Sequence, residues 1–129
     1  MTNREALSFV WQTPGDRQEM VWTSERCYIT ELFNDERKPE MSLALSRVEE
    51  GVRTQLHALR DVEEVYIIRL GSGVVEIDGR EAPVATGDSV VIPPSASQRI
   101  ENTGKGDLEF YCLCRPRFQQ DCYVNLENE

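Results

Sequence analysis

The chain has 129 residues and a mass of 14.8 kDa, and 40% of its residues are hydrophobic. This is enough apolar material to close the core of one domain, and it excludes a second full domain. Fourteen Lys and Arg residues against 23 Asp and Glu residues give a formal net charge of −9, so the surface should repel phosphate backbones and anionic lipids. We therefore expect neither nucleic acid nor a membrane as a partner.

The cysteines and the first residues indicate the compartment. Arg4 and Glu5 stand where a secretory signal would need an apolar block. The four cysteines form no C-x2-C pair, and a domain of this size needs no disulfides, so we predict reduced thiols. The apolar stretch 65–68 is far shorter than the roughly 20 residues that span a bilayer. These features predict a cytoplasmic protein.

In chain order, residues 1–25 contain Trp11 and Trp22 in otherwise polar sequence and are expected to form an N-terminal arm or an extra strand. Short strands separated by turn residues follow, without helical periodicity longer than about two turns, which predicts an all-β domain over residues 26–118. The expected strands are 26–33, 41–48, 53–59, 64–70, 73–78, 80–84, 89–92, 97–102 and 108–114. Asp78-Gly79 is the strongest hairpin signal. The tail, residues 119–129, is expected to form one helical turn and then fray.

Two segments carry regularly spaced glycine and polar residues. The positions are Gly51, His57, Glu64 and Gly71 in the first segment, and Gly87, Pro93 and Asn102 in the second. They resemble the two motifs of the cupin superfamily, G-x5-H-x-H-x(3,4)-E-x6-G and G-x5-P-x-G-x2-H-x3-N. The resemblance spans residues 51–102 and implies a single-domain, jelly-roll-like barrel, the cupin double-stranded β-helix.

Three positions depart from these motifs. Leu59 replaces the second histidine of the first motif, and Ser95 and Gln98 replace the glycine and the histidine of the second. In cupins with the full set, three histidines and one glutamate bind a divalent transition metal. The resemblance therefore implies His57, Glu64 and Gln98 as the metal ligands and a divalent metal ion as the candidate cofactor.

The identity of such an ion stays open. One imidazole, one carboxylate and one amide oxygen are a thin set for Zn²⁺ or Fe²⁺. Mn²⁺ or Mg²⁺ with several waters would tolerate this set better. If Cys112 faced inward, a softer site would become possible, but strand parity alone does not decide which way it faces.

Strand alternation indicates a pocket independently of the resemblance. Side chains two residues apart share one face of a strand, so polar and apolar groups from three strands should meet near the mouth of the barrel. The polar groups are Gln55, His57, Glu64, Tyr66 and Gln98, and the apolar wall is Leu59, Ile68, Leu70 and Ile100. An apolar lining with a few convergent polar groups is typical of a small-molecule site.

Two functions follow from such a pocket. As an enzyme, the protein would use His57 and Glu64 as catalytic acid and base, with or without a metal, in isomerase, epimerase or lyase chemistry on a small polar metabolite. As a non-catalytic binding module or sensor, it would recognise that metabolite through Gln55, His57, Tyr66 and Gln98. The apolar residues of the N-terminal segment also predict a homodimer, in which the first 25 or so residues cover an edge strand of the partner.

Overall fold

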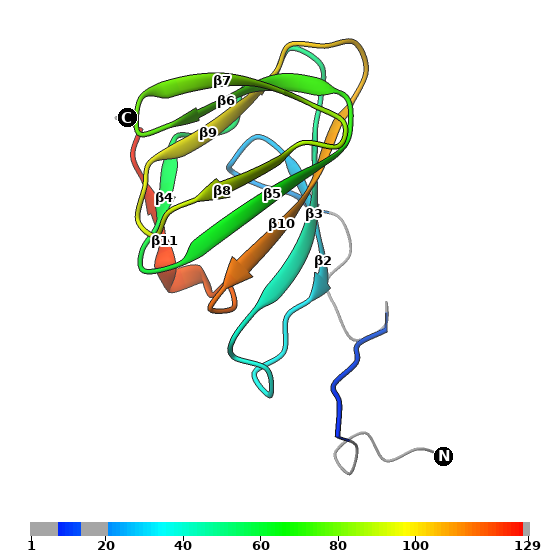
Figure 1. Ribbon diagram of the computed structural model, residues 1–129, viewed down its shortest axis with the longest axis vertical. Coiled ribbons are helices and arrows are strands. Elements are labelled where there is room, and N and C mark those ends of the chain that lie inside the picture. The colour runs from blue at the N-terminus through cyan, green and yellow to red at the C-terminus, as the bar shows by residue number, and fades with distance from the viewer. Residues whose placement is uncertain (1–7, 14–20, 128–129) are drawn as a thin grey trace.

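The computed structural model describes residues 8–13 and 21–127, and the strands of the second range form two antiparallel sheets (Figure 1). The first sheet has the order β1 (Val21–Trp22), β2 (Tyr28–Phe33), β3 (Ser42–Val48), β10 (Leu108–Arg115), β5 (Glu63–Leu70) and β8 (Ser89–Ile92). The second has the order β11 (Tyr123–Asn125), β4 (His57–Leu59), β9 (Gln98–Asn102), β6 (Ser72–Ile77) and β7 (Arg80–Ala85). A 3-10 turn, η3 (Gln120–Cys122), precedes β11. The all-β prediction is confirmed, and no helix in the described ranges is long and apolar enough to cross a membrane.

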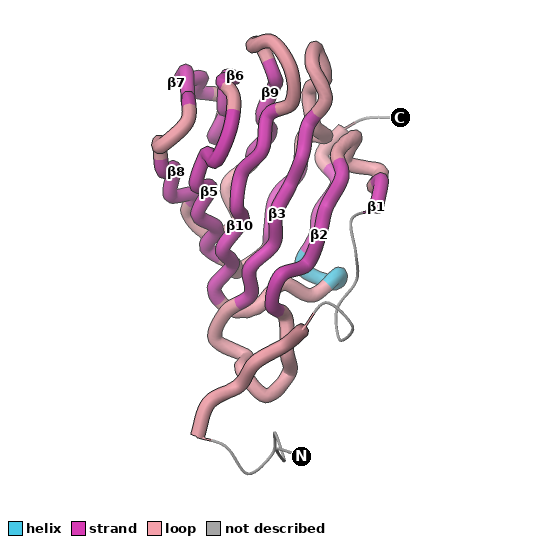
Figure 2. The backbone as a smooth tube through the Cα atoms, turned by 90° about the vertical axis from the view of Figure 1, so that its right-hand side faces the viewer, coloured by secondary structure: helices cyan, strands magenta, loops and turns pink. Residues whose placement is uncertain are grey.

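The core lies between the inner faces of the two sheets. Along β10 the buried residues alternate with partly exposed ones, as expected for a strand with one face in the core. Ile68 and Ile92 from the first sheet and Val75 and Ile100 from the second belong to the same buried cluster. Figure 2 shows β2, β3, β10 and β5 side by side in the first sheet. Burial of these side chains supplies the main stabilising free energy of the barrel.

The predicted two-residue hairpin is confirmed between β6 and β7. Asp78 and Gly79 have φ angles of 49° and 81°, and Ile77 pairs with Arg80 across the turn. Positive φ at both central residues is the conformation that Asp-Gly tolerates and that matches the twist of the two strands.

Strand β4 is shorter than the predicted strand 53–59. The residues just before β4 form hydrogen bonds outside the sheet. The Gln55 amide donates to the Glu25 carbonyl at 3.0 Å, and the Leu56 amide donates to Glu127 Oε2 at 2.9 Å. The prediction of a frayed tail is also wrong for residues 123–125, which pair with β4 as β11. These two departures bring the tail and the β1–β2 turn next to β4.

Leu70 does not belong to the inner wall, contrary to the prediction. An extra residue in β5, Arg69, places Ile68 opposite Phe110 but Leu70 opposite the adjacent β10 residue, Glu109. This irregularity turns the end of β5 outward, and Leu70 is 48% exposed.

The predicted N-terminal arm is described only in part. Residues 21–22 add an edge strand to the first sheet, and Gln12 bonds the backbone of Asn34 near the end of β2. Residues 1–7 and 14–20 lie outside the described residues, so pairing of the arm with a partner chain stays a prediction.

Candidate functional site

A cavity of about 410 Å³ lies inside the barrel. Its wall combines the inner faces of β2, β3, β5 and β10 with β4, the β1–β2 turn and the segment that follows β10. The chemically distinctive lining groups are the carboxylates Glu25, Glu31 and Glu64, the thiols Cys27, Cys112 and Cys114, the imidazole of His57, and the rings of Tyr66, Phe110, Phe118 and Tyr123. The cavity is therefore acidic and aromatic.

Glu64 is the carboxylate of β5 that lines the cavity, and its side chain is almost completely enclosed. Oε2 accepts a hydrogen bond from the Cys114 thiol at 3.6 Å, whereas the buried Oε1 has no partner among the described residues. Burial, and secondly the negative charge of Glu25, raise the pKa of Glu64 to about 7, although polar contacts with Gln98 and the thiols oppose the shift. Glu64 can therefore gain and lose a proton near neutral pH.

Tyr66 and Gln98 form a buried pair beside Glu64. The Tyr66 hydroxyl donates to Gln98 Oε1 at 2.6 Å, and Gln98 is 1% exposed. Burial raises the pKa of Tyr66 well above its ordinary value, so the ring keeps its proton. Because this hydroxyl occupies the amide oxygen, Gln98 acts here as a partner of Tyr66.

His57 is held in one tautomer. Its Nδ1–H donates to the Gln55 carbonyl at 2.8 Å, and its ring stacks on Tyr123 with centroids 4.8 Å apart. Burial lowers the pKa of His57, so the imidazole is neutral near pH 7. Nε2 then carries a lone pair and lies 3.8 Å from Glu25 Oε1, which is too long for a hydrogen bond.

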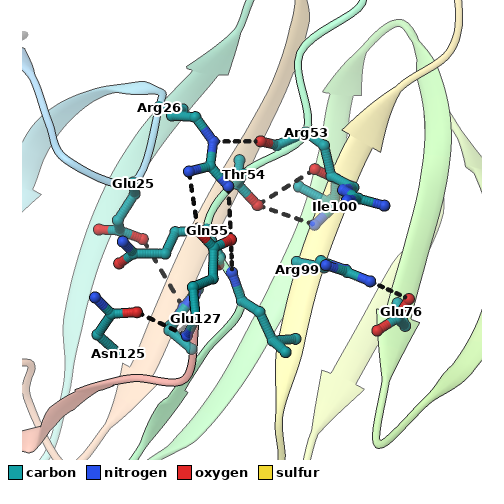
Figure 3. Close-up of polar contacts among 12 residues, drawn as sticks. Glu25, Arg26, Arg53, Thr54, Gln55, Glu76, Arg99, Ile100, Asn125 and Glu127 are labelled. Carbon is teal, nitrogen blue, oxygen red and sulfur yellow. Dashed lines mark hydrogen bonds and ion pairs between the residues drawn. The ribbon is translucent and has the colours of Figure 1, made fainter. Parts of the chain in front are cut away.

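Glu25 belongs to the turn between β1 and β2. Its pKa is raised to about 7 because the carboxyl group is buried. The neighbouring Arg26 turns to Glu127, at 2.7 Å, and to the Arg53 carbonyl, at 2.9 Å (Figure 3). Glu25 was not among the predicted site residues, because it lies before the motifs and before the first predicted strand, where no periodicity fixes the direction of its side chain.

The cysteines add buried thiols to the same wall. Cys112 faces the cavity, which answers the question that strand parity left open, and its Sγ lies 3.4 Å from Ser46 Oγ. Burial raises the pKa of Cys112 well above its ordinary value and that of Cys27 to about 12. These thiols stay protonated near neutral pH and are poor nucleophiles.

The five predicted site residues divide into two layers. His57, Glu64 and Tyr66 line the cavity. Gln55 and Gln98 are buried behind them: Gln55 Oε1 accepts from the Tyr123 hydroxyl at 2.5 Å, as Gln98 does from Tyr66. The glutamines thus orient two aromatic rings of the cavity wall.

The donor set does not fit a resident metal ion. Within residues 8–13 and 21–127, no three His, Cys, Asp or Glu side chains are grouped closely enough to hold one. Leu59 offers no ligand atom, and the Gln98 oxygen is already bonded to Tyr66. Catalytic metals usually need three good protein ligands, and of the family's four ligand positions only His57 and Glu64 remain to supply one.

Comparisons with known proteins agree with this barrel. The family model for the cupin domain matches residues 44–114. An uncharacterized protein of Methanocaldococcus jannaschii is 31% identical over 118 residues, which are 90% of this chain and 94% of that protein. An oxalate-binding protein of Thermotoga maritima is 38% identical over 63 residues, 49% of this chain and 52% of that protein.

Solved structures show the same fold. A predicted oxalate decarboxylase from Thermotoga maritima matches with a TM-score of 0.69 and 26% identity, over 81% of this chain and 96% of that one. The Streptomyces nucleoside dehydratase Pac13 matches with a TM-score of 0.75 and 16% identity, over 94% and 92% of the two chains. The expected cupin barrel is confirmed, and the chain belongs to the cupin superfamily.

Proposed function

We propose that this cupin binds a small polar metabolite in the barrel cavity and catalyses a metal-independent proton transfer on it, of the lyase or epimerase type. The observation that carries the proposal is Glu64 Oε1, a buried carboxylate oxygen in the cavity wall that lacks a partner in the described chain. Leaving such an atom unpaired costs stability, which a structural core avoids and a binding site recovers when its ligand binds. The pKa of Glu64, about 7, suits a group that exchanges a proton at neutral pH.

A second proton carrier lies in the same cavity. Glu25 also has a pKa of about 7, and the neutral His57 ring lies beside it. In an elimination of water, the Glu64 carboxylate takes a carbon-bound proton, the electron pair of that C–H bond forms a C=C bond, and the C–O bond on the neighbouring carbon breaks. The Glu25 carboxyl group then gives its proton to the leaving hydroxyl. In an epimerisation, the Glu25 carboxyl group instead returns a proton to the same carbon from the opposite side.

Two related proteins suggest ligands, but this cavity fits them unequally. The oxalate-binding relative takes a dianion, whereas three carboxylates and no Lys or Arg side chain line the cavity in the described part of this chain. Pac13 is a nucleoside dehydratase, and at 16% identity it contributes only the fold. The proposal rests on the geometry of Glu64.

Exchange of carbon-bound hydrogen tests the proposal directly. The protein is incubated in D2O with a defined panel of hydroxy acids, polyols, amino alcohols and nucleosides, and each compound is followed by ¹H NMR. We expect at least one compound to lose a C–H signal, or to gain a vinylic one, with the wild type and not with Glu64→Gln. A matched control is Glu63→Gln, because Glu63 precedes Glu64 on β5 and its side chain points away from the cavity. Its carboxylate lies 3.3 Å from Nη2 of Arg115, whose side chain is 65% exposed.

The outcomes separate the two functions considered. Binding without exchange would favour a non-catalytic binding or sensor cupin. Exchange that persists in Glu64→Gln would contradict the role of Glu64. The predicted cytoplasmic location remains part of the proposal and is supported by Cys27, Cys112, Cys114 and Cys122, which are all free.

A further inference from the structure

The cavity holds an excess of acidic side chains and of hydrogen-bond acceptors. Glu25, Glu31 and Glu64 line it, and among the described lining residues no Lys or Arg balances them. Glu31 is bonded to Asn34 Nδ2 at 3.0 Å, but Glu25 and Glu64 repel one another. A ligand that enters must therefore meet at least two carboxylates.

In the described part of the chain, the arginines that adjoin this wall along the sequence are bonded to groups other than Glu25 and Glu64. Arg26 donates to both carboxylate oxygens of Glu127, and Arg117 donates to Asn34 Oδ1 at 2.8 Å. Figure 3 shows the Arg26 guanidinium directed to Glu127 and the Arg53 carbonyl. If Arg26 or Arg117 turned to neutralise the cavity carboxylates, these contacts would have to break.

One buried acceptor atom of the cavity lacks a donor, and a second atom is oriented to accept one. Glu64 Oε1 has none in the described chain although Glu64 is 6% exposed, and His57 Nε2 lies beyond hydrogen-bond distance of Glu25. The tautomer fixed by the Gln55 carbonyl makes Nε2 an acceptor. A protonated amine supplies both the missing charge and several N–H donors.

We infer that the cavity selects a small organic ammonium compound, whose charged nitrogen lies at the Glu64 carboxylate beside Glu25 and whose carbon skeleton packs on the aromatic wall. This inference rests on the proposed function, because it names the class of metabolite. Tyr66 and Phe110 form a tilted ring pair 4.6 Å apart on this wall, and Tyr123 lies at its other side on β11. Aromatic faces attract ammonium groups and also bind hydrocarbon.

Three probes of one skeleton test the inference: benzylamine, benzyl alcohol and benzoate. Their dissociation constants for the full chain are measured by ligand-observed NMR at pH 8, above the pKa of about 7 of both Glu25 and Glu64. We expect benzylamine to bind about tenfold more tightly than benzyl alcohol, and benzoate to bind most weakly.

Two variants assign the preference to the cavity. Glu64→Gln should weaken benzylamine about tenfold and leave benzyl alcohol unchanged, because only a charge is removed. Glu25→Gln is a second, independent variant with the same expected direction, and Glu63→Gln on the outer surface should change neither affinity. Equal binding of benzylamine and benzyl alcohol, or an amine preference that survives both cavity variants, would overturn the inference and leave the proposed pocket intact. Failure of all three probes to bind would overturn both.

Discussion

Replacement of Glu64 by Gln should change how the stability of the protein depends on pH. In the folded chain the pKa of Glu64 is about 7, against an ordinary value of 4.5. Between these pH values the folded state holds a proton that the unfolded state has released. The free energy of unfolding therefore falls as pH rises from about 4.5 and reaches its lower level above about 7.

The magnitude follows from the same pKa. The interval from 4.5 to about 7 corresponds to about 3 kcal/mol, at about 1.4 kcal/mol for each pH unit. Glutamine keeps the shape of the side chain and cannot ionise. Relative to the wild type, Glu64→Gln should therefore gain up to about 3 kcal/mol of stability between pH 5 and pH 8. Glu25 titrates in the same range and keeps part of the pH dependence in the variant.

Urea unfolding followed by circular dichroism at pH 5, 6, 7 and 8 measures this difference. Glu63→Gln is the control, because it removes only the surface pair with Arg115 and should stay within about 1 kcal/mol of the wild type at each pH. A stability difference for Glu64→Gln that is constant with pH, or that shrinks as pH rises, would refute the assignment of Glu64 as a desolvated carboxyl group.

Three further outcomes are expected. Gly73→Ala should cost about 3 kcal/mol in urea unfolding, because its Cβ would lie 2.2 Å from the Glu101 carbonyl oxygen; a loss below 1 kcal/mol would show that β6 and β9 separate easily. Asn102→Ala should cost about 2–4 kcal/mol, since Asn102 bonds the Val48 and Gly106 carbonyls and the Gly104 amide; an unchanged urea midpoint would contradict this role. Light scattering should give twice the 14.8 kDa chain mass and, after deletion of residues 1–20, a monomer. A monomeric full chain would refute the predicted homodimer, and a dimer that survives the deletion would assign its interface to another face.

Much of the scaffold could be predicted because its determinants are local. Gly51, Gly71 and Gly87 all have positive φ, a conformation that glycine adopts without steric cost. Asn102 ties the ends of two strands to one loop through its own amide. These motif positions build the barrel whatever its ligand, so the family resemblance predicted the fold better than the chemistry.

The cavity could be predicted only in part because its wall depends on non-local pairing. Glu25 faces the cavity through a turn in which Arg26 has a φ of 67°, and a run of alternating residues does not reveal such a turn. Tyr123 reaches His57 because the tail pairs with β4, a contact between segments more than 60 residues apart. Leu70 shows the converse: alternation predicted it inside, and an extra residue in its own strand, β5, moved it out.

Leu59 offers a direct test of metal independence. It is 3% exposed, lines the cavity and packs with Val62 and Cys114. In the cupins that this chain resembles, a second histidine stands at this position. Leu59→His should therefore give Zn²⁺ three candidate donors, together with His57 and Glu64.

The substitution itself should destabilise the chain by about 2 kcal/mol, because it places a polar ring in an apolar cluster. Zn²⁺ at about 100 times its dissociation constant would return about 2.7 kcal/mol, so the Tm of Leu59→His should rise with added Zn²⁺. The wild type and Leu59→Asn, a variant of similar polarity without a strong metal ligand, should show no rise. Uptake of one Zn²⁺ per wild-type chain with a comparable rise in Tm would refute metal independence. A Leu59→His variant that ignores Zn²⁺ would instead show that His57 and Glu64 do not converge as the family's ligands do, and the proton-transfer proposal would then depend on Glu64 and Glu25 alone.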